Sequence, residues 1–562
     1  MDRIILGLYD GPSGGAALLS EGELLAIAEE DRLVRQHRVS GLPRSSVQSV
    51  LAQTNVSPPR ISVVTVATQN ATYAEGIGHT ARRPLLARVS DAFPKPEPVG
   101  RRIRDSFAAS RRRRVDEALR SEFGIKCPVR FVEHHLAHAI GAVFAAGLSD
   151  ALAITLDGGA DSCWGRVTRF RQGIPEERVS LTGEQSLLGF LEETCDLLGI
   201  PEGLDRLLRL ELLANEGRPT HENDLAAHVR FDGGGILVDS SALHRALRGR
   251  RAWDEGRADL AASALEVVGR ATRSFVEHWS ATEGVDTVAL GGDLFEVSAI
   301  VEAAARAERV RRLAMPMAPG DVSLAVGAAF AGGLPGYLPR PLAAPGTPLA
   351  SPFLGVAYSD AVIERALRRE EFDYRVQSEI EADIARVLAE GRTVARFHGR
   401  TEIGNRGLGN RTILRSPEGA LRRGRVGFLM PPGAYHALVM HEHYGEWFET
   451  DPIAHDELLR MPLSVRPHSA FRVRCPELVG RSGSTRVQVV SAQSNPGLHR
   501  ILHEFGSWSG LPILAAAPFR LPDEPLVSSP MDALRTFHQL GADYAAIGSF
   551  LVRARGRARA FA

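Results

Sequence analysis

Lysine is almost absent from this sequence. The two lysines are Lys95 and Lys126, so every basic side chain from residue 127 to residue 562, histidine aside, is an arginine. A catalytic lysine is therefore excluded from most of the chain. An anion site in that region must be built from guanidinium groups, backbone N–H groups or a metal ion.

Several features that mark particular protein classes are also missing. No apolar run approaches the length of a membrane span and residues 1–11 lack a signal-peptide pattern, so we expect a cytoplasmic protein with no membrane partner. Basic and acidic residues both number 67, which gives no reason to expect nucleic acid as a partner. The cysteines are widely spaced without a C-x-x-C pair, which favours reduced thiols: Cys127, Cys163, Cys195 and Cys475.

The length of the chain predicts at least two domains, because 562 residues exceed what one ordinary core can organise. Residues 332–353 are rich in proline and glycine and interrupt the periodicity on both sides, so we expect a linker there. The expected domains cover residues 1–331 and 354–562. Strand-length apolar runs alternate with helical patterns, which indicates an α/β fold.

Two stretches repeat one local pattern. Residues 4–29 are predicted to form strand, turn, strand, turn and strand, and residues 150–170 repeat the beginning of this arrangement. In both, an apolar strand ends in Asp-Gly followed by more small residues, a turn whose amides can approach phosphate oxygens. A single Asp-Gly turn would mean little, since it is the commonest hairpin turn. Two of them indicate a duplicated fold with a nucleotide between the halves.

A pair of histidines begins an apolar, alanine-rich run in "FVEHHLAHAIGAVFAAG", residues 131–147. His134 and His138 are four residues apart, so their rings share one helix face and either bind one metal ion or simply cap and pack. His135 stands where a zinc protease has its glutamate, which excludes that class. A third ligand must come from elsewhere, and our candidate is Asp321, at the tip of a loop that precedes a second small-residue helix.

Glycine alternates with charged side chains in "GRTEIGNRGLGNRTIL", residues 399–414. Glycines let a ligand approach the backbone, and forked guanidinium groups bind phosphates or carboxylates through two hydrogen bonds. A structural salt-bridge cluster would not need so much glycine. The segment therefore predicts a second ligand site.

This segment resembles the G-R-x-E-x-G-x-R-x-L-G-N-R-S-I-L signature of the O-carbamoyltransferases. Other blocks resemble the same family: "AEEDRLVRQH" is similar to E-E-E-R-x-x-R-x-K-H, "HHLAHA" to H-H-x-A-H-A, and "TLDGGADS" to T-x-D-G-x-G-D. "APGDVSLAVGAAF" is similar to P-x-x-G-D-x-G-x-A-x-G-A-A. The resemblance extends over nearly the whole chain.

The resemblance implies an N-terminal Kae1-like domain of the duplicated actin and Hsp70 ATPase superfold, followed by a YrdC-like domain. In such enzymes the second site makes carbamoyladenylate from ATP and carbamoyl phosphate, and the first transfers the carbamoyl group to a hydroxyl of a small natural product, as in antibiotic biosynthesis. The implied cofactors are Fe²⁺, or another divalent metal, and ATP with Mg²⁺. The partners are carbamoyl phosphate and a small hydroxylated acceptor, and a homodimer is left open.

The resemblance also implies three sets of site residues. The metal ligands would be His134, His138 and Asp321. Asp157, Gly158 and Asp161 would flank the nucleotide phosphates, and Gly291 and Gly292 would lie against the adenosine. The second site would contain Arg400, Glu402, Arg406, Asn410, Arg411, Arg486 and Gln488.

Some blocks depart from the family pattern. Pro12 and Ser13 stand where relatives have the His and Asp of G-H-D, so the expected general base is missing. The best fit to K-x-R-E-x-F-R-P-F-A-P is residues 427–437, which lack its lysine and both arginines, and L-N-T-S-F-N has become "AAAPFR" at 515–520. An alternative is therefore a diverged protein that transfers another activated group, or a non-catalytic regulatory protein that binds nucleotide and metal.

Overall fold

The structure is a computed structural model. It describes residues 3–69, 97–183, 186–239, 253–349, 351–419, 421, 424–449, 455–480 and 482–554.

The first sheet is built around a central strand that pairs in two different ways. In sheet order its strands are β3 (Glu23–Glu29), β2 (Gly15–Ser20), β1 (Ile4–Tyr9), β4 (Ile61–Ala67) and β5 (Val129–Val132). β1 pairs antiparallel with β2 through the Asp-Gly turn, and parallel with β4. The three strands expected within residues 4–29 are thus confirmed.

A second sheet repeats this topology. Its strands, in sheet order, are β8 (Ile174–Leu181), β7 (Cys163–Arg171), β6 (Ala151–Ala160), β11 (Thr287–Gly291) and β12 (Arg312–Ala314). β6 again pairs antiparallel with the next strand of the chain and parallel with a later one. Both sheets therefore share one strand order and one pattern of directions, which is the duplicated arrangement of the actin and Hsp70 superfold.

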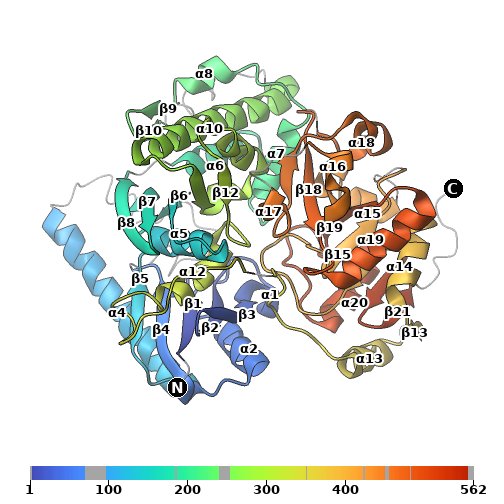
Figure 1. Cartoon of the computed structure of the whole chain (residues 1–562), viewed down its shortest axis with the longest axis horizontal. Coiled ribbons are helices and arrows are strands. Elements are labelled where there is room, and N and C mark those ends of the chain that lie inside the picture. The colour runs from blue at the N-terminus through green and yellow to red at the C-terminus, as the bar shows by residue number, and fades with distance from the viewer. Residues whose placement is uncertain are drawn as a thin grey trace.

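Two small-residue helices, α5 (His134–Ala145) and α12 (Leu324–Ala331), pack between these sheets (Figure 1). They are apolar all round because each contacts a sheet as well as the other helix. A Cβ atom on Gly327 would overlap the carbonyl oxygen of Ala137, so glycine is what allows the two helices to touch. This close approach places the N-terminal ends of both helices beside each other.

Replacing Gly327 with alanine is expected to lower the free energy of unfolding by about 1–3 kcal/mol, because the methyl group must push α12 away from the backbone of α5. Gly346→Ala is the matched control, since a Cβ there would meet no atom within 4 Å. Denaturant titration of both variants measures the difference. Equal unfolding midpoints would contradict the packing described here.

The C-terminal part contains a mixed nine-stranded sheet. In sheet order its strands are β13 (Tyr374–Val376), β21 (Phe550–Arg553), β20 (Tyr544–Ile547), β14 (Val394–Phe397), β15 (Arg411–Arg415), β19 (Ile513–Pro518), β16 (His436–Met440), β18 (Thr485–Val490) and β17 (Leu463–Val465). Side chains alternate between the faces: Leu414 packs with α14 (Ile380–Ala389) and α19 (Pro496–Ser509), whereas Ile413 belongs to the core that includes α20 (Pro530–Leu540).

Further helices pack around the sheets, and α1 and α7 lie where the N-terminal and C-terminal parts meet (Figure 1). They are α1 (Glu30–Val34), α2 (Arg44–Thr54), α4 (Glu97–Phe123), α6 (Leu187–Leu197), α7 (Arg206–Ala214), α8 (Glu222–Ala226), α10 (Trp253–Glu283), α11 (Ser298–Ala305), α13 (Asp360–Arg369), α15 (Gly424–Leu429), α16 (Tyr444–Trp447), α17 (His455–Leu458) and α18 (Ser469–Arg474). A small hairpin joins β9 (Val229–Asp232) to β10 (Gly235–Val238). None of the helices in the described ranges has the length and apolar character that crossing a membrane requires.

The expected linker connects the two parts. Within its described residues, 332–349 and 351–353, it contains no helix or strand. The two five-stranded sheets precede it and the nine-stranded sheet follows it. The exact domain limits at residues 331 and 354 stay a prediction.

Candidate functional site

Four side chains converge where α5 and the short helix η3 (Asp321–Ser323) begin. The Nε2 atoms of His134 and His138 are 3.2 Å apart. Asp321 Oδ1 lies 3.7 Å from Nε2 of His134 and 3.6 Å from Nε2 of His138. Asp157 Oδ2, on β6, lies 3.5 Å and 3.2 Å from the same two atoms. The structure thus brings the three predicted metal ligands together and adds Asp157, which the sequence assigned to the nucleotide.

The donor set of this four-residue cluster suits a divalent cation. Imidazole and carboxylate are common ligands of first-row metals, and atoms bound to one ion at about 2.1 Å stand about 3.0–3.4 Å apart. The separations in the cluster are close to this range. Asp321 Oδ1 is buried without a hydrogen-bond partner in the described part of the chain, which is costly for a carboxylate unless a cation lies beside it. These donors do not select iron over other divalent metals.

The cluster requires positive charge. Burial disfavours a charged ring at His134, but the hydrogen bond to Asp157 and the charge of Asp321 outweigh it and raise the pKa of His134 to about 9. Burial would raise the pKa of Asp157, yet its hydrogen bonds to His134 and His138 hold that pKa well below the ordinary value. A proton on the imidazoles or a bound cation satisfies the same demand.

Neighbouring polar groups hold the cluster in place. The Thr68 hydroxyl lies 3.1 Å from His134 Nδ1, and the Tyr9 hydroxyl donates to Asp321 Oδ2 at 2.8 Å. Asp161, expected beside the nucleotide phosphates, accepts a hydrogen bond from the backbone N–H of His134 at 2.9 Å. Its carboxylate therefore fixes the first residue of α5, a favourable place for a negative charge.

His135 is excluded from the cluster although it lies between the two ligand candidates. Its Nδ1 lies 3.0 Å from the Thr155 hydroxyl and its Nε2 lies 3.2 Å from the carbonyl oxygen of Cys163. Burial and the neighbouring His134 lower the pKa of His135 to about 3. It is a neutral, fully bonded core histidine.

The sequence interpretation missed two further acids, Asp293 and Glu296, on the short helix η2 (Asp293–Glu296). The Asp293 carboxylate accepts the N–H of Asp321 at 3.0 Å, and the Asp293 N–H lies 3.3 Å from Asp157 Oδ2. Burial, and then the charges of Asp157 and Asp321, raise the pKa of Asp293 well above its ordinary value. Asp293 therefore connects the backbone of Asp321 to the carboxylate of Asp157.

The glycines expected near the nucleotide have different surroundings. Gly158 lines a cavity beside the cluster and donates its N–H to Asp157 Oδ1 at 2.6 Å. A Cβ on Gly291 would lie 3.3 Å from His138, and a Cβ on Gly292 would overlap the carbonyl oxygen of Leu156. Gly291 and Gly292 therefore allow close packing of β11, which differs from the expected contact of both with adenosine.

A cavity of about 540 Å³, which we call the central cleft, joins the cluster to the C-terminal part. On one side it is lined by Tyr9, His134, Asp157 and Asp321. On the other side it is lined by residues 404–408 of the glycine-rich loop together with Arg486 and His436. One cleft thus borders both the cluster and part of the predicted second site.

Two of the arginines expected in the second site line this cleft. Arg406 donates to the carbonyl oxygens of Pro462 at 3.1 Å and Glu296 at 2.6 Å. Arg486 donates to the carbonyl oxygen of Gly433, and burial lowers its pKa to about 10. Within the described residues the hydrogen bonds of both guanidinium groups go to neutral carbonyl oxygens, so both groups can also bind an anionic ligand.

The other five residues of that set bond the protein itself. Glu402 is buried, and its Oε1 accepts N–H groups of Leu408, Asn410 and Arg411 at 2.8–3.2 Å. Arg411 is fully buried, donates to the carbonyl oxygen of His398 at 2.7 Å and stacks on Phe397.

The remaining three behave in the same way. Asn410 donates to the carbonyl oxygen of Arg400, and Arg400 donates to that of Leu354. Gln488 donates to the carbonyl oxygen of Leu408 at 2.9 Å. Arg400, Glu402, Asn410, Arg411 and Gln488 thus bond the protein itself and shape the loop, and their place in the second site stays a prediction.

Helix α1 holds the glycine-rich loop against the N-terminal part. Arg32 donates to the carbonyl oxygens of Glu402 and Gly404 and pairs with Glu29 at 2.9 Å. Glu29 in turn accepts the N–H of Gly404 at 2.9 Å. Both side chains are buried, and their contacts with the glycine-rich loop fix the position of one wall of the cleft.

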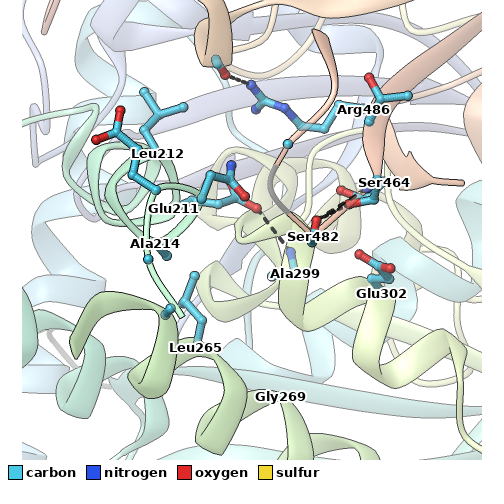
Figure 2. Close-up of a pocket in the computed structure, with 18 of the residues that line it drawn as sticks. Glu211, Leu212, Ala214, Leu265, Gly269, Ala299, Glu302, Ser464, Ser482 and Arg486 are labelled. Carbon is cyan, nitrogen blue, oxygen red and sulfur yellow. Dashed lines mark hydrogen bonds between the residues drawn. The ribbon is translucent and has the colours of Figure 1, made fainter. Parts of the chain in front are cut away.

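A second, larger cavity of about 1280 Å³ lies beside the cleft, between α7, α10, α11 and the C-terminal sheet (Figure 2). Glu211 and Arg486 line both cavities, so they form part of the wall between them. Glu211 accepts the N–H of Ala299 at 3.1 Å, which fixes its carboxylate at this point.

Comparison with known proteins supports the sequence resemblance. Residues 385–554 match the family model described as the carbamoyltransferase C-terminus. By this match, residues 385–554 form a carbamoyltransferase C-terminal domain. The matched region carries the glycine-rich loop, Arg486 and Gln488, so the predicted resemblance to the O-carbamoyltransferases is confirmed.

Curated proteins are similar to this chain at modest identity. Nodulation protein NolNO of Sinorhizobium fredii is 27% identical over 96% of this chain and 79% of its own length. The 3'-hydroxymethylcephem-O-carbamoyltransferase of Streptomyces clavuligerus is 31% identical over 27% of this chain and 29% of its own length. Among solved structures, T. kodakarensis HypF overlaps 59% of this chain and 47% of its own, with 16% identity and a TM-score of 0.36.

Proposed function

We propose that this protein is an ATP-dependent O-carbamoyltransferase. Water releases phosphate from carbamoyl phosphate, and the resulting carbamate attacks the α-phosphate of ATP, which forms carbamoyladenylate and releases pyrophosphate. An acceptor hydroxyl then takes the carbamoyl group, and AMP and the hydroxyl proton leave. The proposal rests on the carbamoyltransferase C-terminal match and on one structural observation: a single cleft is lined by a metal-type cluster on one side and by Arg406 and Arg486 on the other.

Arg406 and Arg486 serve the donor side of this reaction. Carbamoyl phosphate and the ATP phosphates are anions, and lysine is absent from this part of the chain. Guanidinium groups that hydrogen-bond only neutral carbonyl oxygens retain the charge and donors needed to bind such groups. Glu402 supports them by fixing the loop that carries Arg406.

His134, His138, Asp157 and Asp321 serve the transfer side. A divalent metal held by them would polarise a phosphate or carbonyl oxygen and stabilise the negative charge that develops during transfer. Thr68 and Tyr9 orient the ligand side chains through His134 Nδ1 and Asp321 Oδ2. The acceptor then meets the activated group in the cleft between the cluster and the two arginines.

A second candidate is the transfer of a different activated group. Ala434 and Pro518 line the cleft in segments where the family pattern has donor-bearing side chains, so fewer phosphate contacts are available than in relatives. Each charge-assisted contact contributes about 1.5–3 kcal/mol, so their loss would weaken donor binding strongly.

Pyrophosphate release separates these candidates. With ATP, Mg²⁺ and carbamoyl phosphate, the full-length protein is expected to release pyrophosphate, and acetyl phosphate or bicarbonate is expected to support little. Arg406→Met should lower that rate by about 10- to 100-fold, because one charge-assisted contact is lost. The matched control is Arg369→Met, whose side chain is 78% exposed on α13. No pyrophosphate with carbamoyl phosphate under any divalent metal would exclude carbamoylation.

A further inference from the structure

The central cleft is also lined by a histidine of the C-terminal sheet, His436, which belongs neither to the metal-type cluster nor to the arginines. His436 is the first residue of β16 and is 5% exposed. It lines the cleft together with Arg406 and Arg486.

The hydrogen bonds around this ring determine its tautomer. The carbonyl oxygen of Leu408 only accepts, so the Gln488 atom 2.9 Å from it must be the amide nitrogen. Gln488 Oε1 is then an acceptor, and it lies 3.1 Å from His436 Nε2. Nε2 therefore carries the ring proton and Nδ1 carries a lone pair.

The Nδ1 atom is directed to the cleft rather than to the protein. Among the described residues it has no hydrogen-bond partner, and it is not one of the fully enclosed unpaired atoms. Burial and the charge of Arg486 lower the pKa of His436 to about 3, so the ring stays neutral near pH 7 and its lone pair remains available. The cleft wall thus presents a neutral acceptor beside two guanidinium donors.

We propose that His436 Nδ1 recognises the amino group of the carbamoyl donor by accepting a hydrogen bond from it. This assignment rests on the proposed function and specifies how the donor is selected. Arginines only donate, so Arg406 and Arg486 can bind the oxygens of a carbamoyl or an acyl phosphate equally well. Carbamoyl phosphate has an N–H group that acetyl phosphate lacks. An acceptor at His436 Nδ1 can hydrogen-bond this group and so discriminates between the two donors. His436 is thus a specificity-determining residue, positioned by Gln488.

Two substitutions separate recognition from structural support. Asparagine at this position places an amide oxygen near the site of Nδ1 but cannot reach Gln488, whereas glutamine can reach Gln488 but leaves Nδ1 unreplaced. Binding of carbamoyl phosphate and of acetyl phosphate to the full-length wild type, His436→Asn and His436→Gln is measured by calorimetry. His436→Gln is expected to weaken the binding of carbamoyl phosphate about 10- to 100-fold and to leave the binding of acetyl phosphate unchanged. His436→Asn is expected to keep most of the preference for carbamoyl phosphate over acetyl phosphate.

A lower affinity of His436→Asn than of His436→Gln for carbamoyl phosphate would overturn the inference. If His436→Asn loses as much affinity for carbamoyl phosphate as His436→Gln does, the ring only supports Gln488 and the glycine-rich loop. The same conclusion follows if a substitution weakens the binding of carbamoyl phosphate and of acetyl phosphate equally. In a wild type that releases pyrophosphate with carbamoyl phosphate, that result rejects the role of His436 alone. A wild type that neither binds carbamoyl phosphate nor releases pyrophosphate rejects this role together with the proposed function.

Discussion

Replacing His138 with alanine is expected to remove the bound divalent metal and to lower carbamoyl transfer by at least about 10²-fold. The ring is completely buried, and its Nε2 lies 3.2 Å from the Nε2 of His134 and from Asp157 Oδ2, so no other side chain can take its place. Metal content per chain after purification and dialysis, measured by plasma mass spectrometry, tests the first effect. Transfer to an acceptor hydroxyl tests the second.

His135→Gln is the matched control for this experiment. His135 is an equally buried imidazole on the same helix, but both of its ring nitrogens lie within hydrogen-bond distance of groups outside the cluster, the Thr155 hydroxyl and the Cys163 carbonyl. The control is expected to lower stability while retaining the metal. Unchanged metal content in His138→Ala, or loss of metal in both variants, would show that the cluster does not bind the ion as assigned. Pyrophosphate release, which depends on the other side of the cleft, should survive in His138→Ala.

Replacing Arg32 with methionine is expected to lower the free energy of unfolding by about 3–5 kcal/mol. The substitution leaves the buried Glu29 without its ion-pair partner and removes the donors to the carbonyl oxygens of Glu402 and Gly404. Denaturant titration measures the change. The glycine-rich loop is also released from α1, so pyrophosphate release should fall as well.

The double variant Glu29→Gln/Arg32→Met tests whether the cost comes from the uncompensated charge. Removing that charge should restore a large part of the lost stability, although the two donors to the loop stay absent. A double variant no more stable than Arg32→Met would place the cost in the lost loop contacts instead.

The defect of Arg32→Met should also depend on pH. Burial raises the pKa of Glu29 in the folded protein, against the opposing effect of Arg32. Without Arg32 this rise is larger, so the folded state takes up a proton more readily than the unfolded state. A group with a raised folded pKa favours folding at low pH, and this stability is lost as pH rises through the folded pKa. The variant should therefore lie closer to wild type at pH 5 than at pH 8, and a pH-independent difference would argue against a buried charge.

Local spacing allowed part of the site to be predicted. Residues four apart on a helix face the same way whatever packs around them, so His134 and His138 could be paired from the sequence. The strands of the first hairpin, and the repeat of its pattern at residues 150–170, could also be predicted from the sequence, because apolar runs and Asp-Gly turns are local signals. The resemblance to the O-carbamoyltransferases followed from several such blocks in order.

Residue type and motif alone could not say which way a charged side chain points. Arg411 and Arg406 lie in the same motif, yet Arg411 is fully buried on a central strand of the nine-stranded sheet, whereas Arg406 lines the cleft. Glu402 matches a family signature and serves to hold three backbone N–H groups of its own loop. Such differences depend on which neighbours surround a residue, and motif spacing does not contain that information.

The sequence by itself determined that lysine chemistry is absent from residue 127 onward, that two imidazoles share a helix face and that the N-terminal fold is duplicated. Only the tertiary structure decided that Asp157 joins those imidazoles and that the cleft extends from them to Arg406 and His436. The physical reason is the distance along the chain: helix faces and hairpin turns depend on interactions between residues only a few positions apart. The meeting of residues hundreds of positions apart follows from how α5, α12 and the C-terminal sheet pack.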